Sequence, residues 1–170
     1  MYRSGFDYTM FKASSLSVVQ PDAEDREAFL KEWEYDKQFA SRLALDVSHL
    51  NRTKKEFEYF QQYSMDNVFE LYVYKWVVTT LNKLADLRGK KQFTIGHHIP
   101  MALGGVHYPT NWTIQTGTDN SNAKDHMPEN LMKPSWDEQF FYILDHMGEE
   151  YKSYKFVYLV PILLKLQEVY

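Results

Sequence analysis

Glycine and proline are concentrated in one part of this 170-residue chain, and their distribution limits the fold more than any other feature. Five of the seven glycines lie between Gly89 and Gly117, and four of the six prolines lie between Pro100 and Pro134. These two residue types interrupt helices and mark turns. We therefore expect a loop-rich region with short strands at about 89–134 and helices on both sides of it.

The residues on the N-terminal side of this region carry apolar side chains at the spacing of amphipathic helices. Proline and acidic residues mark helix starts there, and a glycine marks a helix end. Three helices are expected: one from Pro21 to about Val47, a short one from Thr53 through Phe60, and one over 68–88 that Asp66 caps and Gly89 ends.

The residues on the C-terminal side carry equally clear helix signals. Ser135, with Glu138 three residues later, has the pattern of a capping box, and Gly148 follows the apolar stripe that begins there. A last helix is expected over 156–169, entered or kinked at Pro161. Together with the short strands of the middle region, these helices predict an α+β fold that is mostly helical.

The composition predicts a single compact domain. Hydrophobic residues make up 44% of the chain, and the absence of cysteine excludes disulfides, thiolate metal ligands and thiol nucleophiles. The most apolar run, 156–164, is too short to span a bilayer, and the first residues do not resemble a secretory signal. We therefore expect a cytoplasmic protein without membrane contact. Within the domain we expect a helical N-terminal region at 1–88, a central unit at 89–134, and C-terminal helices at 135–170 that pack on the central unit.

The segment 92–131 holds the residues that suit chemistry. A short alternating strand at 93–95 leads to two adjacent histidines, His97 and His98, in front of a loop that contains proline and two glycines. A second alternating strand, 112–115, is expected to return antiparallel to the first. Because neighbouring strand residues point to opposite faces, the two imidazoles are expected to have different roles unless the loop brings them together.

A short polar helix is expected after Gly117, which ends the second strand. Either Thr118 or Asp119 can cap this helix. Its polar residues are Asn120, Asn122, Lys124 and His126. The order of elements is thus strand, loop, strand and helix.

The residue types of this segment suit the hydrolysis of a phosphodiester bond. Imidazole can take a proton from water near neutral pH. Amide oxygens and imidazole nitrogens are both ligands for divalent cations. A base beside a metal ion that polarises a phosphoryl oxygen is sufficient equipment for this reaction.

At these residues the sequence resembles the HNH endonuclease family, whose core is a ββα-metal finger. The matching residues, in chain order, are His97 or His98, Pro100, Gly104, Gly105, Asn111, Asn120 and Lys124. The resemblance covers about 40 of the 170 residues, and a chain of this size with helical flanks resembles the small phage-encoded members.

The resemblance implies a metal-dependent endonuclease that acts on DNA. One histidine of the adjacent pair would be the general base, and Asn111 would brace the loop that orients it. Asn120 would help to hold one divalent ion, with Mg²⁺ expected first and Mn²⁺, Ni²⁺ or Zn²⁺ as alternatives. The residues expected to contact nucleic acid are Lys90, Lys91, His107 and Lys124.

The roles of the two histidines stay open at this point. The family's spacing of three residues from base to proline, counted back from Pro100, favours His97 as the base and leaves Gly96 at the position of a metal ligand. If His97 is instead read as the metal ligand, His98 becomes the base.

The helix also departs from the family pattern. The usual spacing of three residues between asparagine and lysine is four here, from Asn120 to Lys124. A shifted helix could present Asn122 and His126, four residues apart, on one face. His126 is therefore a reserve metal ligand.

The net charge of -4 is distributed unevenly along the chain. The window 88–133 has five basic and three acidic residues, and the remainder carries a net charge of -6. Any contact with DNA is therefore expected to be compact rather than spread over the surface. The acidic remainder also favours a second hypothesis, a helical interaction or regulatory protein with a catalytically degraded finger. Besides DNA, the partners to consider are a second copy of the chain, in a homodimer, or another protein.

Overall fold

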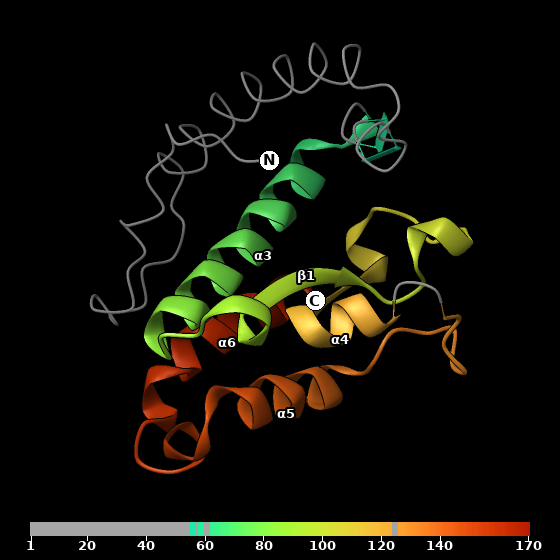
Figure 1. Cartoon of the computed structure of the whole chain (residues 1–170). Coiled ribbons are helices and arrows are strands. Elements are labelled where there is room, and N and C mark those ends of the chain that lie inside the picture. The colour runs from blue at the N-terminus through green and yellow to red at the C-terminus, as the bar shows by residue number, and fades with distance from the viewer. Residues whose placement is uncertain (1–54, 57, 60–61, 124–125) are drawn as a thin grey trace.

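The computed structural model describes residues 55–56, 58–59, 62–123 and 126–170 (Figure 1). The helix expected from Pro21 to Val47 lies outside these residues. The main elements, in chain order, are α3 (Met65–Leu84), β1 (Phe93–His97), β2 (Trp112–Thr116), α4 (Gly117–Ala123), α5 (Trp136–Met147) and α6 (Val160–Val169). Short 3-10 turns are found at Gly89–Lys91, Met101–Leu103, Pro109–Asn111, Glu149–Lys152 and Phe156–Tyr158.

A capping box fixes the start of α3. The main-chain N–H of Asn67 donates to the hydroxyl of Ser64 (3.1 Å), and the N–H of Ser64 donates to the amide oxygen of Asn67 (3.2 Å). The prediction that Asp66 caps this helix is therefore wrong, because Asp66 lies in the first turn. Ser64 precedes it and satisfies the free N–H groups of that turn.

The end of α3 also differs from the prediction. The helix stops at Leu84 rather than near Arg88, and Asp86 adopts a left-handed conformation (φ 48°) two residues later. Gly89 has a positive φ as well, but it opens the next 3-10 turn instead of ending the helix. Aspartate tolerates the left-handed region better than most residues, so it can take the role expected of glycine.

The core is built around α3. Its buried side chains cluster with the inner face of the sheet and with α5 and α6. The buried members on α3 are Val68, Leu71, Tyr72, Val73, Tyr74, Trp76, Val77 and Leu81. Most sides of this helix are therefore covered, and no helix of the described residues is long and apolar enough to cross a membrane.

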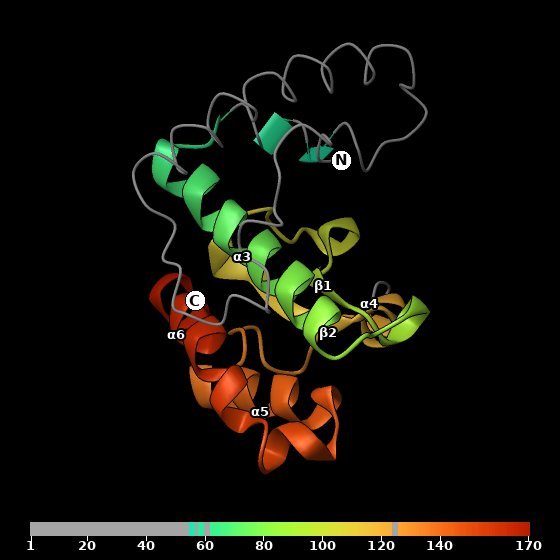
Figure 2. The same cartoon turned by 90° about the vertical axis from the view of Figure 1, so that its left-hand side faces the viewer.

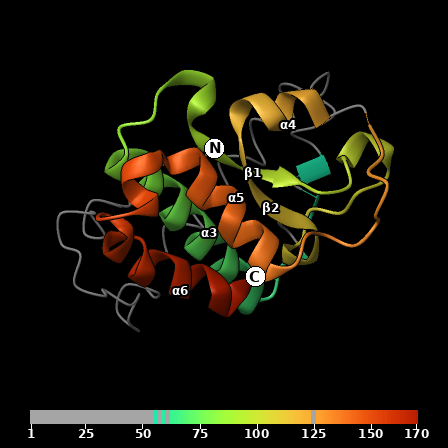
Figure 3. The ribbon, with the colours of Figure 1, turned by 90° about the horizontal axis from the view of Figure 1, so that it is seen from below.

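The two strands form an antiparallel sheet, as predicted. The register pairs Phe93 with Thr116 and His97 with Trp112. Figures 2 and 3 show the strands between α3 on one side and α4 on the other. The face that carries Phe93 and Trp112 belongs to the buried core, so it is the face toward α3.

Side-chain amides from two helices complete both edges of this sheet. On the outer edge of β1, the N–H of Phe93 donates to the amide oxygen of Asn82 (2.7 Å), and the Asn82 amide donates back to the Phe93 carbonyl (3.0 Å). On the outer edge of β2, Gln139 makes the same pair of bonds with Ile114, at 2.8 Å and 3.0 Å. Main-chain groups that a third strand would normally pair are thus satisfied by helices.

A capping box and a proline mark the starts of the two C-terminal helices. The capping box of Ser135 and Glu138 opens α5, as predicted. Pro161 lies in the first turn of α6, where its missing N–H costs nothing. This helix starts at Val160 rather than Phe156, because a separate 3-10 turn at Phe156–Tyr158 precedes it.

Lys133 connects the segment before α5 to the end of α6. Its ammonium group donates to the main-chain oxygens of Tyr170 (2.7 Å) and Pro109 (3.0 Å), and it lies 3.8 Å from the centre of the Tyr170 ring. Burial lowers the pKa of Lys133 to about 8, an effect that the charge of Glu70 opposes. Lys133, one of the five basic residues of the window 88–133, thus holds this segment to the end of α6.

Candidate functional site

His97 points toward the core side of the sheet. It pairs across the strands with Trp112, and directly paired residues lie on the same face. The Nε2 atom of His97 lies 2.7 Å from Nδ1 of His107, so the two rings share a hydrogen bond. Only 7% of His107 is exposed, and its ring lies 5.3 Å from that of Trp112 and 6.1 Å from that of Tyr63.

The burial of His107 changes what it can do. A contact with phosphate, which the sequence led us to expect, requires an accessible ring. The ring lies instead inside an aromatic cluster, and the hydroxyl of Tyr63 donates to the main-chain oxygen of His107. This placement favours a structural role for His107.

His98 has different surroundings. Its Nε2 atom lies 2.6 Å from the main-chain oxygen of Asn130. Because a carbonyl oxygen can only accept, Nε2 carries the proton of this bond, and in the neutral ring Nδ1 keeps its lone pair. The two adjacent histidines therefore have separate partners, which agrees with the alternation of a strand.

Asn111 ties together the loop that follows the histidines. Its amide oxygen accepts from the N–H of Ile99 (2.8 Å), and its amide nitrogen donates to the carbonyls of Ile99 (2.9 Å) and Val106 (2.8 Å). The two glycines of this loop are required by its shape. Gly104 has φ 95°, and a Cβ at Gly105 would lie 1.8 Å from the oxygen of Ile99.

The polar helix α4 is shorter than expected. Its described residues run to Ala123 and His126 is not helical, so the prediction that Asn122 and His126 share a helix face is wrong. The Nδ1 atom of His126 instead lies 3.2 Å from the main-chain oxygen of Asn122, just beyond the helix. Asn120 lies in the middle of α4 and is partly buried, and Lys124 lies outside the described residues.

The predicted metal ligands come from three places in the chain: His97 ends β1, Asn120 lies on α4, and His126 follows α4. The Nε2 atom of His97 lies against Nδ1 of His107, a residue of the loop before β2. Among the described residues, no three His, Asp or Glu side chains form a group that could hold a metal ion. Asn120 and His126 each keep a group that could bind a metal ion: the side-chain amide oxygen of Asn120 and Nε2 of His126.

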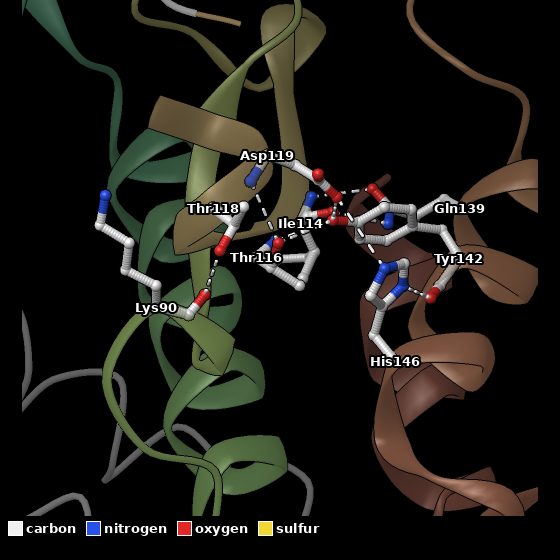
Figure 4. Close-up of polar contacts among 8 residues, drawn as sticks. All are labelled: Lys90, Ile114, Thr116, Thr118, Asp119, Gln139, Tyr142 and His146. Carbon is white, nitrogen blue, oxygen red and sulfur yellow. Dashed lines mark hydrogen bonds and ion pairs between the residues drawn. The ribbon is translucent and has the colours of Figure 1, made fainter. Parts of the chain in front are cut away.

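Two of the predicted basic contacts lie beside α4. Lys90 and Lys91 are exposed in the turn at Gly89–Lys91. The hydroxyl of Thr118 donates to the main-chain oxygen of Lys90 (3.3 Å), which fixes this turn against the first residues of α4. Figure 4 shows the side chain of Lys90 extending away from the helix.

A polar network that the sequence reasoning missed joins α4 to α5 (Figure 4). The hydroxyl of Tyr142 donates to the carboxylate of Asp119 (2.5 Å) and accepts from the N–H of Thr116 (2.8 Å). Burial, together with the bond to Asp119, raises the pKa of Tyr142, so its hydroxyl keeps its proton. The spacing of Thr116 and Asp119 was a signal of this arrangement, because it is close to a capping box.

The hairpin and α4 together offer an imidazole held by Asn130, a loop braced by Asn111 and a short polar helix after β2. No family model, no curated protein and no solved structure matches this chain. A function for this chain therefore has to be inferred from its own residues.

Proposed function

We propose that this chain is a metal-dependent endonuclease of the HNH type that hydrolyses phosphodiester bonds in DNA. The observation that carries the proposal is the orientation of His98, whose Nε2 donates to the carbonyl of Asn130 and leaves Nδ1 as a proton acceptor. The order of strand, loop, strand and helix supports it, and so does the bracing of the loop by Asn111. These are the parts that the resemblance of the sequence led us to expect.

His98 is the better candidate for the general base. It would take a proton from the attacking water at Nδ1, while the bond at Nε2 holds the ring in place. The spacing to Pro100 favoured His97, but Nε2 of His97 is engaged with the buried ring of His107. His97 also faces the core side of the sheet, away from α4.

The metal-binding groups would come from α4 and the residues after it. A bound divalent ion supplies charge stabilisation at the phosphate and at the leaving oxygen. Asn120 offers an amide oxygen, and His126 offers Nε2 because its Nδ1 faces a main-chain carbonyl. An oxygen ligand suits Mg²⁺ or Mn²⁺, and an imidazole ligand suits Ni²⁺ or Zn²⁺.

DNA would be held by few side-chain charges. Lys90 and Lys91 are exposed beside the start of α4, and the remainder of the chain outside 88–133 carries a net charge of -6. Each neutralised phosphate steepens the fall of affinity with salt, so we expect a shallow salt dependence.

The proposal is tested with supercoiled plasmid and the full chain. We expect nicking in the presence of Mg²⁺, Mn²⁺ or Ni²⁺, none after chelation, and none with His98→Ala. The matched control is Tyr154→Phe, because Tyr154 is 73% exposed and far along the chain from the hairpin. A wild-type protein that nicks no DNA with any of these ions contradicts the proposal, and cleavage of RNA alone would redirect it to another nucleic acid.

A second candidate function is that of an interaction protein with an inactive finger. Three large apolar side chains in the segment after α4 are well exposed: Met127 (50%), Leu131 (62%) and Met132 (77%). Exposed apolar groups of this kind are typical of protein contacts. Absence of nicking, together with a stable complex on size-exclusion chromatography, would favour this function.

A further inference from the structure

The start of α4 is capped in an unusual way. Thr116 precedes the helix, and its hydroxyl accepts from the N–H of Asp119 (3.2 Å). In a complete capping box, the side chain of the third helical residue would return to the N–H of the capping residue. Here Asp119 holds that third position, and its side chain is one methylene shorter than that of glutamate.

Tyr142 closes this gap from another helix. The N–H of Thr116 donates to the Tyr142 hydroxyl (2.8 Å), and the same hydroxyl donates to the carboxylate of Asp119 (2.5 Å). The Tyr142 hydroxyl thus acts as a relay between the Thr116 N–H and the Asp119 carboxylate, two groups that a longer acidic side chain at position 119 would join directly. Figure 4 shows the three groups converging between α4 and α5.

The helix that receives this cap is short, and the bond from Thr118 to Lys90 is a second contact at its start. It is seven residues long and buries none of its side chains. Helices of this length are unstable on their own, so their ends depend on capping and on contacts with the rest of the protein. Asn120, the proposed metal ligand, directly follows Asp119.

Tyr142 itself is held firmly. The ring of His146 packs against it at 4.2 Å between centres, and Nδ1 of His146 donates to the main-chain oxygen of Tyr142 (2.7 Å). One turn earlier, Gln139 fixes the same helix to the edge of β2. The Tyr142 hydroxyl therefore lies on α5, which Gln139 anchors to β2. Helix α4 directly follows this same strand.

We infer that Tyr142 is a positioning residue that orients α4, and with it Asn120, through a capping box shared between two helices. The part that concerns Asn120 rests on the proposed nuclease function. The part that concerns the order of α4 stands on the contacts alone.

The first experiment measures amide hydrogen exchange in Tyr142→Phe, with Tyr154→Phe as the exposed control. Loss of the relay should raise exchange in 117–123 by roughly tenfold and leave α3 unchanged, because only the local cap is lost. Equal exchange in the wild type and in Tyr142→Phe would overturn the inference. A uniform rise across α3 and α4 would also overturn it, because that result indicates general destabilisation.

The second experiment measures nicking against the concentration of Mn²⁺. Tyr142→Phe should raise the concentration needed for half-maximal nicking by about tenfold and leave the rate at saturating Mn²⁺ nearly unchanged. A lower saturating rate with an unchanged midpoint would overturn the assignment to Asn120. If the wild type does not nick DNA, the proposed function fails, while the exchange experiment still decides whether Tyr142 orders α4.

A rescue variant makes the test sharper. Glutamate at position 119 is long enough to reach the N–H of Thr116 directly, as in an ordinary capping box. Adding Asp119→Glu to Tyr142→Phe should therefore restore slow exchange in α4 and the original Mn²⁺ midpoint. If the double variant stays as impaired as Tyr142→Phe, the hydroxyl does not act through the cap, and the inference is wrong.

Discussion

The two adjacent histidines at the end of β1 differ in almost every respect except residue type. His97 faces the core side of the sheet and shares a hydrogen bond with the buried ring of His107. His98 lies one residue later and donates to the main-chain carbonyl of Asn130, in the segment between α4 and α5. The two adjacent histidines thus differ in their partners: Nε2 of His97 is bonded to an imidazole, and Nε2 of His98 is bonded to a main-chain carbonyl.

The largest expected effect separates the two histidines by activity. His98→Ala should lower the nicking rate by roughly 10² to 10⁴-fold, the usual contribution of a general base, and leave the free energy of unfolding nearly unchanged. His97→Ala should lower the rate of the folded protein far less. The measurement is a nicking time course at equal folded concentration, and the opposite order of the two variants would make His97 the base.

A smaller effect is expected on stability. His107→Ala removes the hydrogen-bond partner of His97 and leaves space among Tyr63 and Trp112, so we expect a loss of about 2 kcal/mol in the free energy of unfolding. Urea unfolding measures this loss. His146→Ala, which changes a more exposed histidine, provides the comparison and should cost less. If His107→Ala leaves the stability unchanged, the core-side assignment of the pair is wrong.

The smallest expected effect concerns Lys133, which donates to Pro109 close to the start of β2. Its pKa is about 8 in the folded protein, against 10.5 for an ordinary lysine side chain. Between these two values the unfolded chain therefore binds more protons than the folded protein. Stability attributable to Lys133 should therefore rise as the pH increases from 8 to 10.5. Because Lys133 is partly exposed, the rise should be at most about 1 kcal/mol.

Urea unfolding at pH 7.5 and pH 9.5 tests this expectation. The difference in stability between the wild type and Lys133→Met should shift in favour of the wild type at the higher pH. Other groups titrate equally in both proteins and cancel in this difference. A constant difference would show that the ammonium group of Lys133 is not destabilised by burial.

The local features of the fold could be predicted from the sequence. The two strands, their antiparallel return and the capping box of Ser135 depend on residues that are close in the chain. The separate surroundings of His97 and His98 followed from the alternation of a strand. Patterns of this kind act over a few residues, so they can be recognised without a structure.

The features that could not be predicted depend on residues far apart in the chain. Gln139 pairs with Ile114 across 25 positions, and Tyr142 reaches Asp119 across 23 positions. A glutamine or tyrosine on a helix carries no sign of which main-chain group it will meet. The burial of His107 belongs to the same class, because it depends on aromatic residues that precede α3 and on Trp112 of β2.

The amide pairs of Asn82 and Gln139 have a consequence for how this unit could be moved or reused. A fragment limited to 89–134 would leave the outer main-chain groups of Phe93 and Ile114 without the partners they have here. The hairpin therefore cannot be excised alone without the loss of these hydrogen bonds. Its smallest transferable form includes the two helices that border it, and a graft into another scaffold would have to supply both amides.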